Sequence, residues 1–158
     1  MISPPINHSI RHLYQGDETY CWAASLAMLR REPTVDGMMN VVDRSHVSDR
    51  IQKSQIPDVV RRNGCTLLPI PPLFVVSALE AVVRPRAVAL FVTLRAGGRA
   101  SIGSHGHVII VDGLCGDGTP AGTHVHVHDP WEMSGASYTF QHLTTRYWSH
   151  VDYIARRA

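Results

Sequence analysis

Cys21 stands at the head of a run of residues that favour helix, from Trp22 to Arg31. This run predicts that the thiol lies at the start of a buried helix, where the partial positive charge of the helix favours thiolate over thiol. A thiolate in this position suits nucleophilic catalysis, whereas an unpaired cysteine is more often a small buried apolar residue. Cys21 is therefore the candidate nucleophile.

A histidine and an aspartate farther along the chain supply the partners that a catalytic thiol needs. His107 follows Gly106 and opens an apolar strand, so the small glycine permits close approach of a partner group. Asp129 follows a second strand and lies 22 residues after His107. We assign His107 as the general base and Asp129 as the acid that orients the imidazole and stabilises its cation.

Gln15 is the fourth candidate, because it lies six residues before Cys21. This separation allows a side-chain amide from the preceding loop to sit beside the backbone N–H at the helix start. Together the two donors would form an oxyanion hole. The alternative is a surface glutamine in a polar loop.

Four short motifs occur in one order along the chain: Gln15, Cys21-Trp22-Ala23-Ala24-Ser25, Gly106-His107 and Asp129-Pro130-Trp131. In this order they resemble the papain-like cysteine peptidases. The nearest resemblance is to the plant-pathogen type III effector proteases and the related bacteriocin-leader peptidase domains of export transporters.

The resemblance implies a single papain-like domain over residues 1–158 that cleaves a peptide bond through a thioester intermediate. By matching position, Cys21, His107 and Asp129 become the triad, and Gln15 with the Cys21 N–H becomes the oxyanion hole. Trp22 and Trp131 are expected to pack beside the site, where they exclude water and contact the substrate. The resemblance further implies a bacterial secreted effector or toxin with a role in virulence, a protein or peptide substrate, and no cofactor.

The N-terminus bears on where such a protein would act. Met1 to Pro5 lack the basic start and apolar region of a Sec-type signal peptide. We therefore expect secretion or delivery into a target cell by another route, and otherwise a cytoplasmic protein. A host activator, an immunity protein or a secretion apparatus would be its partners. Only about 14 residues precede Gln15, so we expect an excised domain or a smaller relative of the effector proteases.

Two other classes of function compete with peptide-bond hydrolysis. A papain-like deamidase, transglutaminase or peptidoglycan amidase uses the same nucleophile, base and oxyanion donors, so the triad does not distinguish these reactions. The second competitor is a metal-binding module, because His124, His126 and His128 alternate along one strand and share a face, near His105 or His107. No acidic residue of that strand joins this face, which favours a solvated strand face over a metal site.

Composition and pattern predict the elements that must position these residues. The chain has 158 residues, of which 44% are hydrophobic and 18% charged, and a net charge of +2. These values fit one globular domain and do not indicate nucleic-acid binding. The longest apolar stretches are too short to span a membrane. Three cysteines without a C-x-x-C pair argue against a disulfide framework, and Cys65 and Cys115 are expected to be buried thiols.

Helical patterns fill the first half of the sequence and strand patterns the second half. The expected helices are 21–31, 34 or 36–42, 48–54, 57–64 and 73–83, and the expected strands are 87–94, 107–111, 124–128, 137–140 and 151–154. This order predicts an α+β papain-like fold in which N-terminal helices pack on a C-terminal antiparallel β-sheet.

Overall fold

The computed structural model describes residues 1–16, 20–32, 34, 52–95 and 106–158. Its centre is an antiparallel sheet of seven strands with the order β2-β7-β3-β4-β5-β6, and β1 pairs with β4. The strands are β1 (Ile6–Asn7), β2 (Cys65–Leu68), β3 (Val88–Leu94), β4 (Gly106–Gly116), β5 (Thr123–His128), β6 (Ala136–Thr139) and β7 (Trp148–Arg157).

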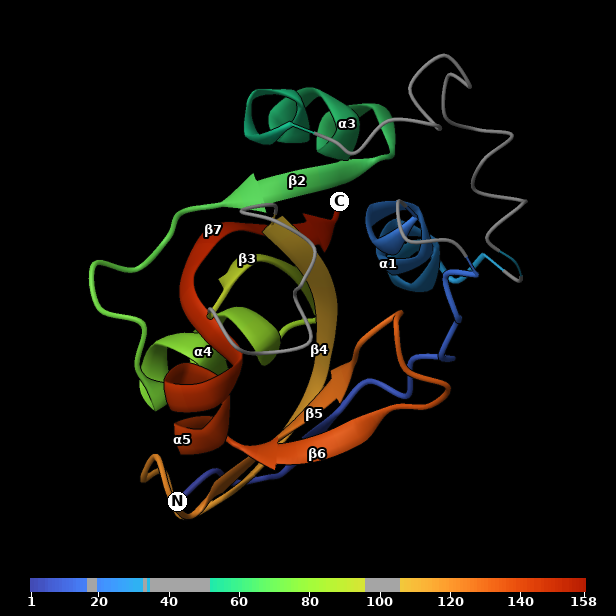
Figure 1. Cartoon of the computed structure of the whole chain (residues 1–158). Coiled ribbons are helices and arrows are strands. Elements are labelled where there is room, and N and C mark those ends of the chain that lie inside the picture. Colours follow the sequence, from blue (N-terminus) through green and yellow to red (C-terminus); the bar gives the residue numbers. More distant parts are fainter. Residues whose placement is uncertain (17–19, 33, 35–51, 96–105) are drawn as a thin grey trace.

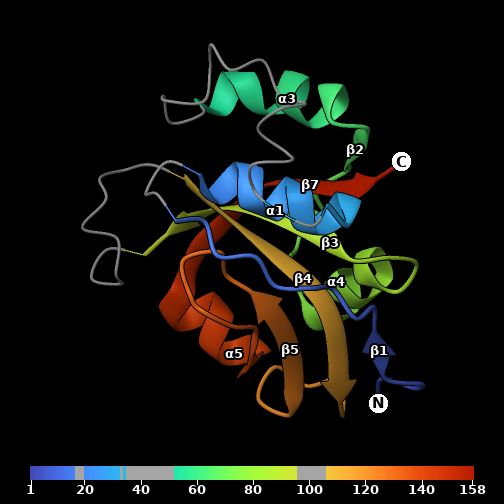
Figure 2. The same ribbon diagram turned by 90° about the vertical axis from the view of Figure 1, so that its right-hand side faces the viewer.

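Helices cover both faces of this sheet. They are α1 (Cys21–Arg30), α3 (Ile56–Arg62), which follows the 3-10 turn Lys53–Gln55, α4 (Val76–Val83), and α5 (Phe140–His142), which continues into a π-helical turn, Leu143–Tyr147. Figure 2 shows α1 and α3 on one side of the strands and α4 and α5 on the other. The fold is therefore a curved sheet between two helical layers.

Helix α1 is the most deeply buried helix of the described chain. Every residue from Trp22 to Leu29 is buried, so the helix is covered around its whole circumference. Its end is marked by Arg31 in the left-handed conformation, with φ 61°. The apolar core on this face also contains Ile56 and Val60 of α3.

The opposite face of the sheet packs against α4 and α5. Leu79 and Val83 of α4 join Phe140 and Leu143 from the α5 region in this second core. Strand β3 supplies alternate side chains to the two cores, since Leu90 belongs to the α4 side and Phe91 to the α1 side. This double burial accounts for the continuous apolar sequence of the strand.

Strand β4 has an irregular register at one residue, Asp112. It pairs with β3 from Gly106 to Val111 and with β1 at Gly113 and Leu114. On its other edge it pairs with β5, where the register shifts between Val111 and Gly113. Asp112 is the residue at the shift, and it is turned into the space beside β5.

The α+β class and the antiparallel sheet are as predicted, and the differences concern individual elements. β4 and β7 are longer than the expected strands 107–111 and 151–154, because glycine and charged residues continue both ladders. The short strands β1 and β2 and the α5 region were not predicted. Most of the expected helices at 34–42 and 48–54 lies outside the described residues. Cys115 is exposed rather than buried.

Candidate active site

Cys21 is the first residue of α1, as its sequence context predicted. One helical turn later, the buried hydroxyl of Ser25 donates a hydrogen bond of 3.1 Å to the carbonyl oxygen of Val108 on β4. Val108 is the neighbour of His107. This bond therefore fixes the start of α1 against the strand that carries the histidine, and Cys21 and His107 lie close enough to share a side-chain hydrogen bond.

His107 and Asp129 are brought together by the pairing of β4 with β5. Nε2 of His107 lies 2.7 Å from Oδ1 of Asp129, and both side chains are 13% exposed. This contact leaves Nδ1 of His107 as the ring nitrogen available to the Cys21 thiol. Burial by itself lowers the pKa of His107, but hydrogen bonds and charges from Asp129 and Cys21 outweigh burial and raise this pKa from 6.5 to about 10.

Asp129 is held by more than the histidine. Its Oδ1 also accepts a hydrogen bond of 2.9 Å from the backbone N–H of Trp131, and its Oδ2 accepts one from the hydroxyl of Tyr147. Burial raises the pKa of Asp129, but the hydrogen bond from His107, its charge and the other two donors lower it below the ordinary value. The carboxylate thus stays ionised and its orientation is set through both oxygens.

Tyr147 is the functional candidate that the sequence did not indicate. Burial, together with the charge and hydrogen bond of Asp129, raises the pKa of Tyr147 well above 10, so its hydroxyl remains a donor. Tyr147 ends the π-helical turn before β7, and this irregular turn has no local sequence pattern that aims a side chain at Asp129.

Gln15 is buried, with 3% of its surface exposed, which excludes the surface-loop alternative. Its backbone N–H donates a hydrogen bond of 2.9 Å to the carbonyl oxygen of Pro130, the residue after Asp129. Two residues earlier, the N–H of Leu13 contacts the sulfur of Met28 on α1 at 3.3 Å. The segment that carries Gln15 therefore bridges α1 and the loop that carries the acidic residue.

The arrangement of a helix-terminal cysteine with a buried His-Asp pair agrees with a comparison against known families. A sequence profile described as papain-like cysteine protease AvrRpt2 matches residues 5–147. The chain belongs to the AvrRpt2 family of papain-like cysteine proteases. It is thus a cysteine peptidase that acts on a protein substrate, and the resemblance inferred from the four motifs is confirmed. None of the curated proteins matches the chain.

The two tryptophans of this AvrRpt2-family chain occupy different environments. Trp22 is 2% exposed and belongs to the α1 core, so we assign its ring to packing behind the nucleophile rather than to substrate contact. Trp131 is partly exposed and lies in the loop of Asp129. Substrate contact by Trp131 remains our prediction. Within the described ranges, no helix combines the length and apolar character needed to cross a membrane.

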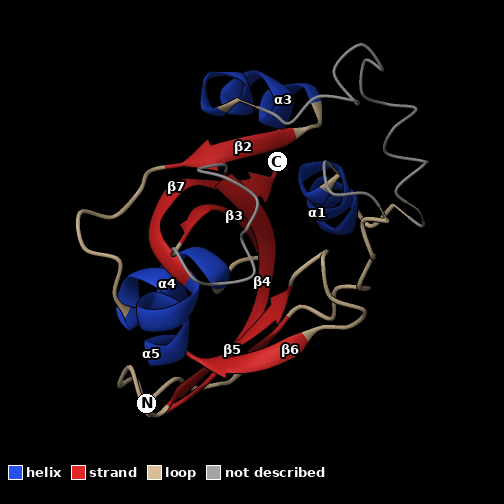
Figure 3. Cartoon of the chain, in the orientation of Figure 1, coloured by secondary structure: helices blue, strands red, loops and turns tan. Residues whose placement is uncertain are grey.

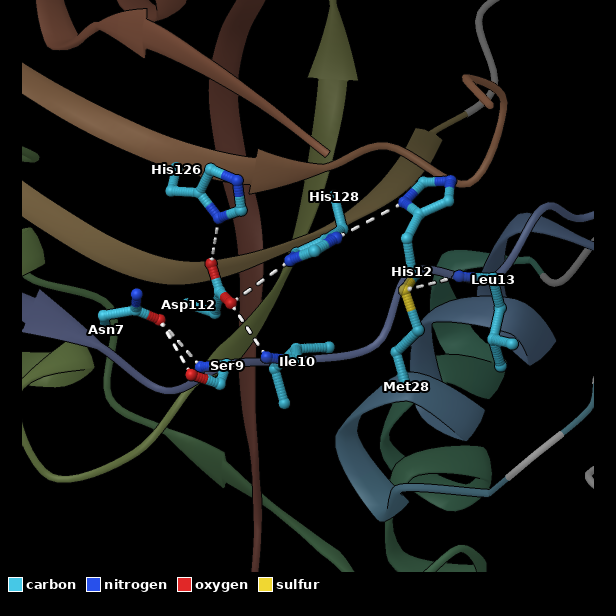
Figure 4. A network of polar contacts seen from close by, with 9 residues as sticks. All are labelled: Asn7, Ser9, Ile10, His12, Leu13, Met28, Asp112, His126 and His128. Carbon is cyan, nitrogen blue, oxygen red and sulfur yellow. Dashed lines mark hydrogen bonds and ion pairs between the residues drawn. The ribbon is translucent and has the colours of Figure 1, made fainter. Parts of the chain in front are cut away.

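A second polar cluster lies on the α1 side of the sheet in the AvrRpt2-family chain. Oδ1 of Asp112 is 2.6 Å from Nδ1 of His126, and Oδ2 is 3.1 Å from Nε2 of His128 (Figure 4). Burial raises the pKa of Asp112, but the hydrogen bonds from the two histidines outweigh it and lower the pKa to about 2. The histidine strand itself supplies no acidic residue to this face, as expected, but the neighbouring strand β4 supplies Asp112, so the face is not simply a solvated one.

Of the other histidines of the metal alternative, the two that the structure describes do not join this cluster. His124 is exposed on the same strand, and His107 is paired with Asp129. His105 lies outside the described residues. The alternation of His124, His126 and His128 therefore places two of the three residues beside Asp112.

Proposed function

We propose that this cysteine protease cleaves a peptide bond with a triad of Cys21, His107 and Asp129. The observation that carries the proposal is the 2.7 Å contact between His107 and Asp129 beside the start of α1. The contact supports a base with a fixed ring orientation, and the raised pKa of His107 favours its protonated form beside a thiolate.

Acylation begins from the ion pair in which His107 already holds the Cys21 proton. The thiolate sulfur then attacks the carbonyl carbon of the substrate, and negative charge develops on the carbonyl oxygen. Gln15 and the backbone N–H of Cys21 are the proposed donors to this oxygen. When the tetrahedral intermediate collapses, His107 gives its proton to the leaving amine and the acyl group remains on sulfur as a thioester.

Deacylation uses the same groups in the reverse sense. His107 removes a proton from a water molecule, whose oxygen attacks the thioester carbon. Collapse of the second tetrahedral intermediate breaks the carbon–sulfur bond, and Cys21 leaves as a thiolate beside the protonated His107. Asp129 stabilises the imidazolium at both stages, and Tyr147 and the N–H of Trp131 hold the carboxylate in place.

Sequencing of newly formed protein N-termini tests peptide-bond cleavage. A candidate target proteome is incubated with the protein, with Cys21→Ala and with Cys115→Ala, whose thiol lies exposed at the far end of β4. New N-termini should appear with the unaltered protein and with Cys115→Ala, and be absent with Cys21→Ala. Release of ammonia, or glutamine cross-links, without new N-termini would instead identify a deamidase or transglutaminase.

We further propose that the protease is a bacterial effector or toxin that leaves the producing cell. Membership of the AvrRpt2 family supports an effector role. A translocation assay with a fused reporter tests this setting, with Cys21→Ala as the cargo so that delivery is measured without proteolysis. Retention of the reporter in the producing cell under secretion-inducing conditions would contradict it.

A further inference from the structure

The cluster of Asp112, His126 and His128 has no part in the proposed triad, yet it is built from metal-ligand side chains. One donor atom from each residue lies within 4.8 Å of the other two. Asp112 is 1% exposed and His128 is 4% exposed, whereas the side chain of His126 is 39% exposed. The two buried members would hold an ion in a fixed position, and the partly exposed His126 would let it enter from solvent.

The sheet geometry brings these three residues together. His126 and His128 are two positions apart on β5 and so project from the same face. The register shift between Val111 and Gly113 turns Asp112 toward that face (Figure 4). Residues from two adjacent strands of a rigid sheet thereby converge on one point.

The ring nitrogens of His12 and His128 limit where hydrogens can lie around the cluster. Nε2 of His12 lies 2.7 Å from the carbonyl oxygen of Glu132, which only accepts hydrogen bonds, so this nitrogen carries a hydrogen. In neutral His12 the other nitrogen, Nδ1, is then an acceptor, and it faces Nδ1 of His128 at 3.3 Å. His128 therefore donates through Nδ1.

This assignment determines the state of the other ring nitrogen of His128, Nε2. In a neutral imidazole that donates through Nδ1, Nε2 bears a lone pair. This lone pair faces Oδ2 of the buried Asp112 carboxylate at 3.1 Å. Two acceptors at this distance repel each other, so this position holds either a second proton on Nε2, which then donates to Asp112, or a metal ion coordinated by both atoms.

The surroundings of the cluster match those of a metal centre. Metal-bound histidines usually donate their second ring nitrogen to an acceptor, as His128 does toward His12. Metal-bound carboxylates are usually hydrogen-bonded as well, and the backbone N–H of Ile10 donates to Oδ2 of Asp112 at 3.0 Å. Outer-shell partners are thus present for His128 and Asp112.

The loop after β5 covers this cluster closely. A side chain at Gly135 would place its Cβ 2.9 Å from Nδ1 of His128 and 3.1 Å from Cε1 of His126. Only a glycine permits that approach to the two rings. Zinc bonds of about 2.0–2.2 Å place neighbouring donors roughly 3–4 Å apart, so a small rotation of the partly exposed His126 would close the site.

We propose that Asp112, His126 and His128 bind one divalent transition-metal ion of the zinc class. Two imidazoles and one carboxylate are a common ligand set for such ions. The ion holds the segment Ile10–Gln15 against the sheet, because Ile10 and His12 contact the ligands directly. His128 also precedes Asp129, so the ion stiffens the neighbourhood of the triad without joining it.

Zinc binding is measured by titration calorimetry and thermal unfolding of chelator-stripped protein. The full chain carries Cys21→Ala and Cys115→Ala, so that neither the candidate nucleophile nor the exposed thiol competes for the ion. One zinc per chain should bind, and zinc at 100 times the dissociation constant should raise Tm by about 5–10 °C. Cobalt in place of zinc should give the visible absorption of a site with nitrogen and oxygen ligands.

Two substitutions on the same strand make a matched pair. His126→Gln should lower zinc affinity at least tenfold and remove most of the Tm rise, while the exposed His124→Gln should leave both unchanged. Asp112→Asn, which keeps the shape of the side chain, should behave as His126→Gln does. Lack of zinc binding, or binding that His126→Gln leaves unchanged, would overturn the proposal. A Tm that changes with pH but not with zinc would show that a proton, not a metal ion, occupies the cluster. This result would also overturn the proposal.

Discussion

The hydroxyl of Tyr147 donates a hydrogen bond to Oδ2 of Asp129, while His107 lies against Oδ1 of the same carboxylate. The two contacts use different oxygens, so rotation of the carboxylate about its own axis would break both. Tyr147 is 18 residues beyond Asp129 in the chain. It acts on the proposed triad as a positioning residue, through Asp129 and not through the substrate.

Tyr147→Phe removes this hydroxyl and leaves the ring in place. A hydrogen bond to a charged group contributes about 1.5–3 kcal/mol. Without it Asp129 holds His107 less firmly, so part of this free energy should be lost from stabilisation of the transition state. We expect kcat to fall roughly tenfold with little change in KM. Tyr153→Phe, on β7 against Phe91, is the control and should leave kcat unchanged. Equal kcat values for the two variants would show that Tyr147 does not act as a positioning residue.

The pH dependence of turnover reports on the His107–Asp129 pair. The pKa of His107 is raised to about 10, so the imidazolium persists at neutral pH and is lost as the pH rises through that value. The basic limb of kcat/KM should therefore lie near pH 10. Asp129→Asn removes a charge that raises this pKa and should move the limb toward lower pH. Asp152→Asn, an aspartate paired with Lys53 on the surface, should not move it.

Alkylation distinguishes the three thiols. Cys115 is exposed and Cys65 is buried, and burial raises the pKa of Cys65. At about pH 5.5 an ordinary thiol, with a pKa near 8.5, is almost wholly protonated and reacts slowly. Cys21 should therefore react first with iodoacetamide at this pH, as peptide mapping would measure. His107→Ala should abolish the preference, and faster labelling of Cys115 in the unaltered protein would contradict the assignment of Cys21.

Gln15 is tested as an oxyanion donor by its effect on kcat. Loss of one such donor costs about 10²–10³ in kcat, so Gln15→Ala should lower kcat by that factor with little change in KM. Gln15→Glu should be at least as poor, because it places negative charge where negative charge develops. Alkylation of Cys21 should persist in both variants, which separates loss of the donor from loss of the nucleophile.

Gln141→Ala is the matched control for this experiment. Its backbone N–H also donates to a proline carbonyl, that of Pro120, but its side chain is exposed. It should retain full turnover. If Gln15→Ala lowers Tm and leaves kcat intact, Gln15 has a packing role and the oxyanion assignment is wrong.

The sequence by itself was sufficient for the features that depend on local pattern. The helix formers after Cys21 place the thiol at a helix start, and apolar strands after His107 and before Asp129 place the imidazole and the carboxylate at strand ends. Periodicity and terminal residues determine such positions within a few residues of the chain. The order of these motifs was also sufficient to identify the papain-like family.

Tertiary structure alone decided the features that need the register of two strands or a distant loop. Asp112 joins His126 and His128 because the ladder between β4 and β5 shifts by a residue, and no property of either strand sequence specifies that shift. Tyr147 reaches Asp129 from a π-helical turn that has no sequence signature. Both contacts join side chains from separate segments, so their geometry exists only once the sheet has formed.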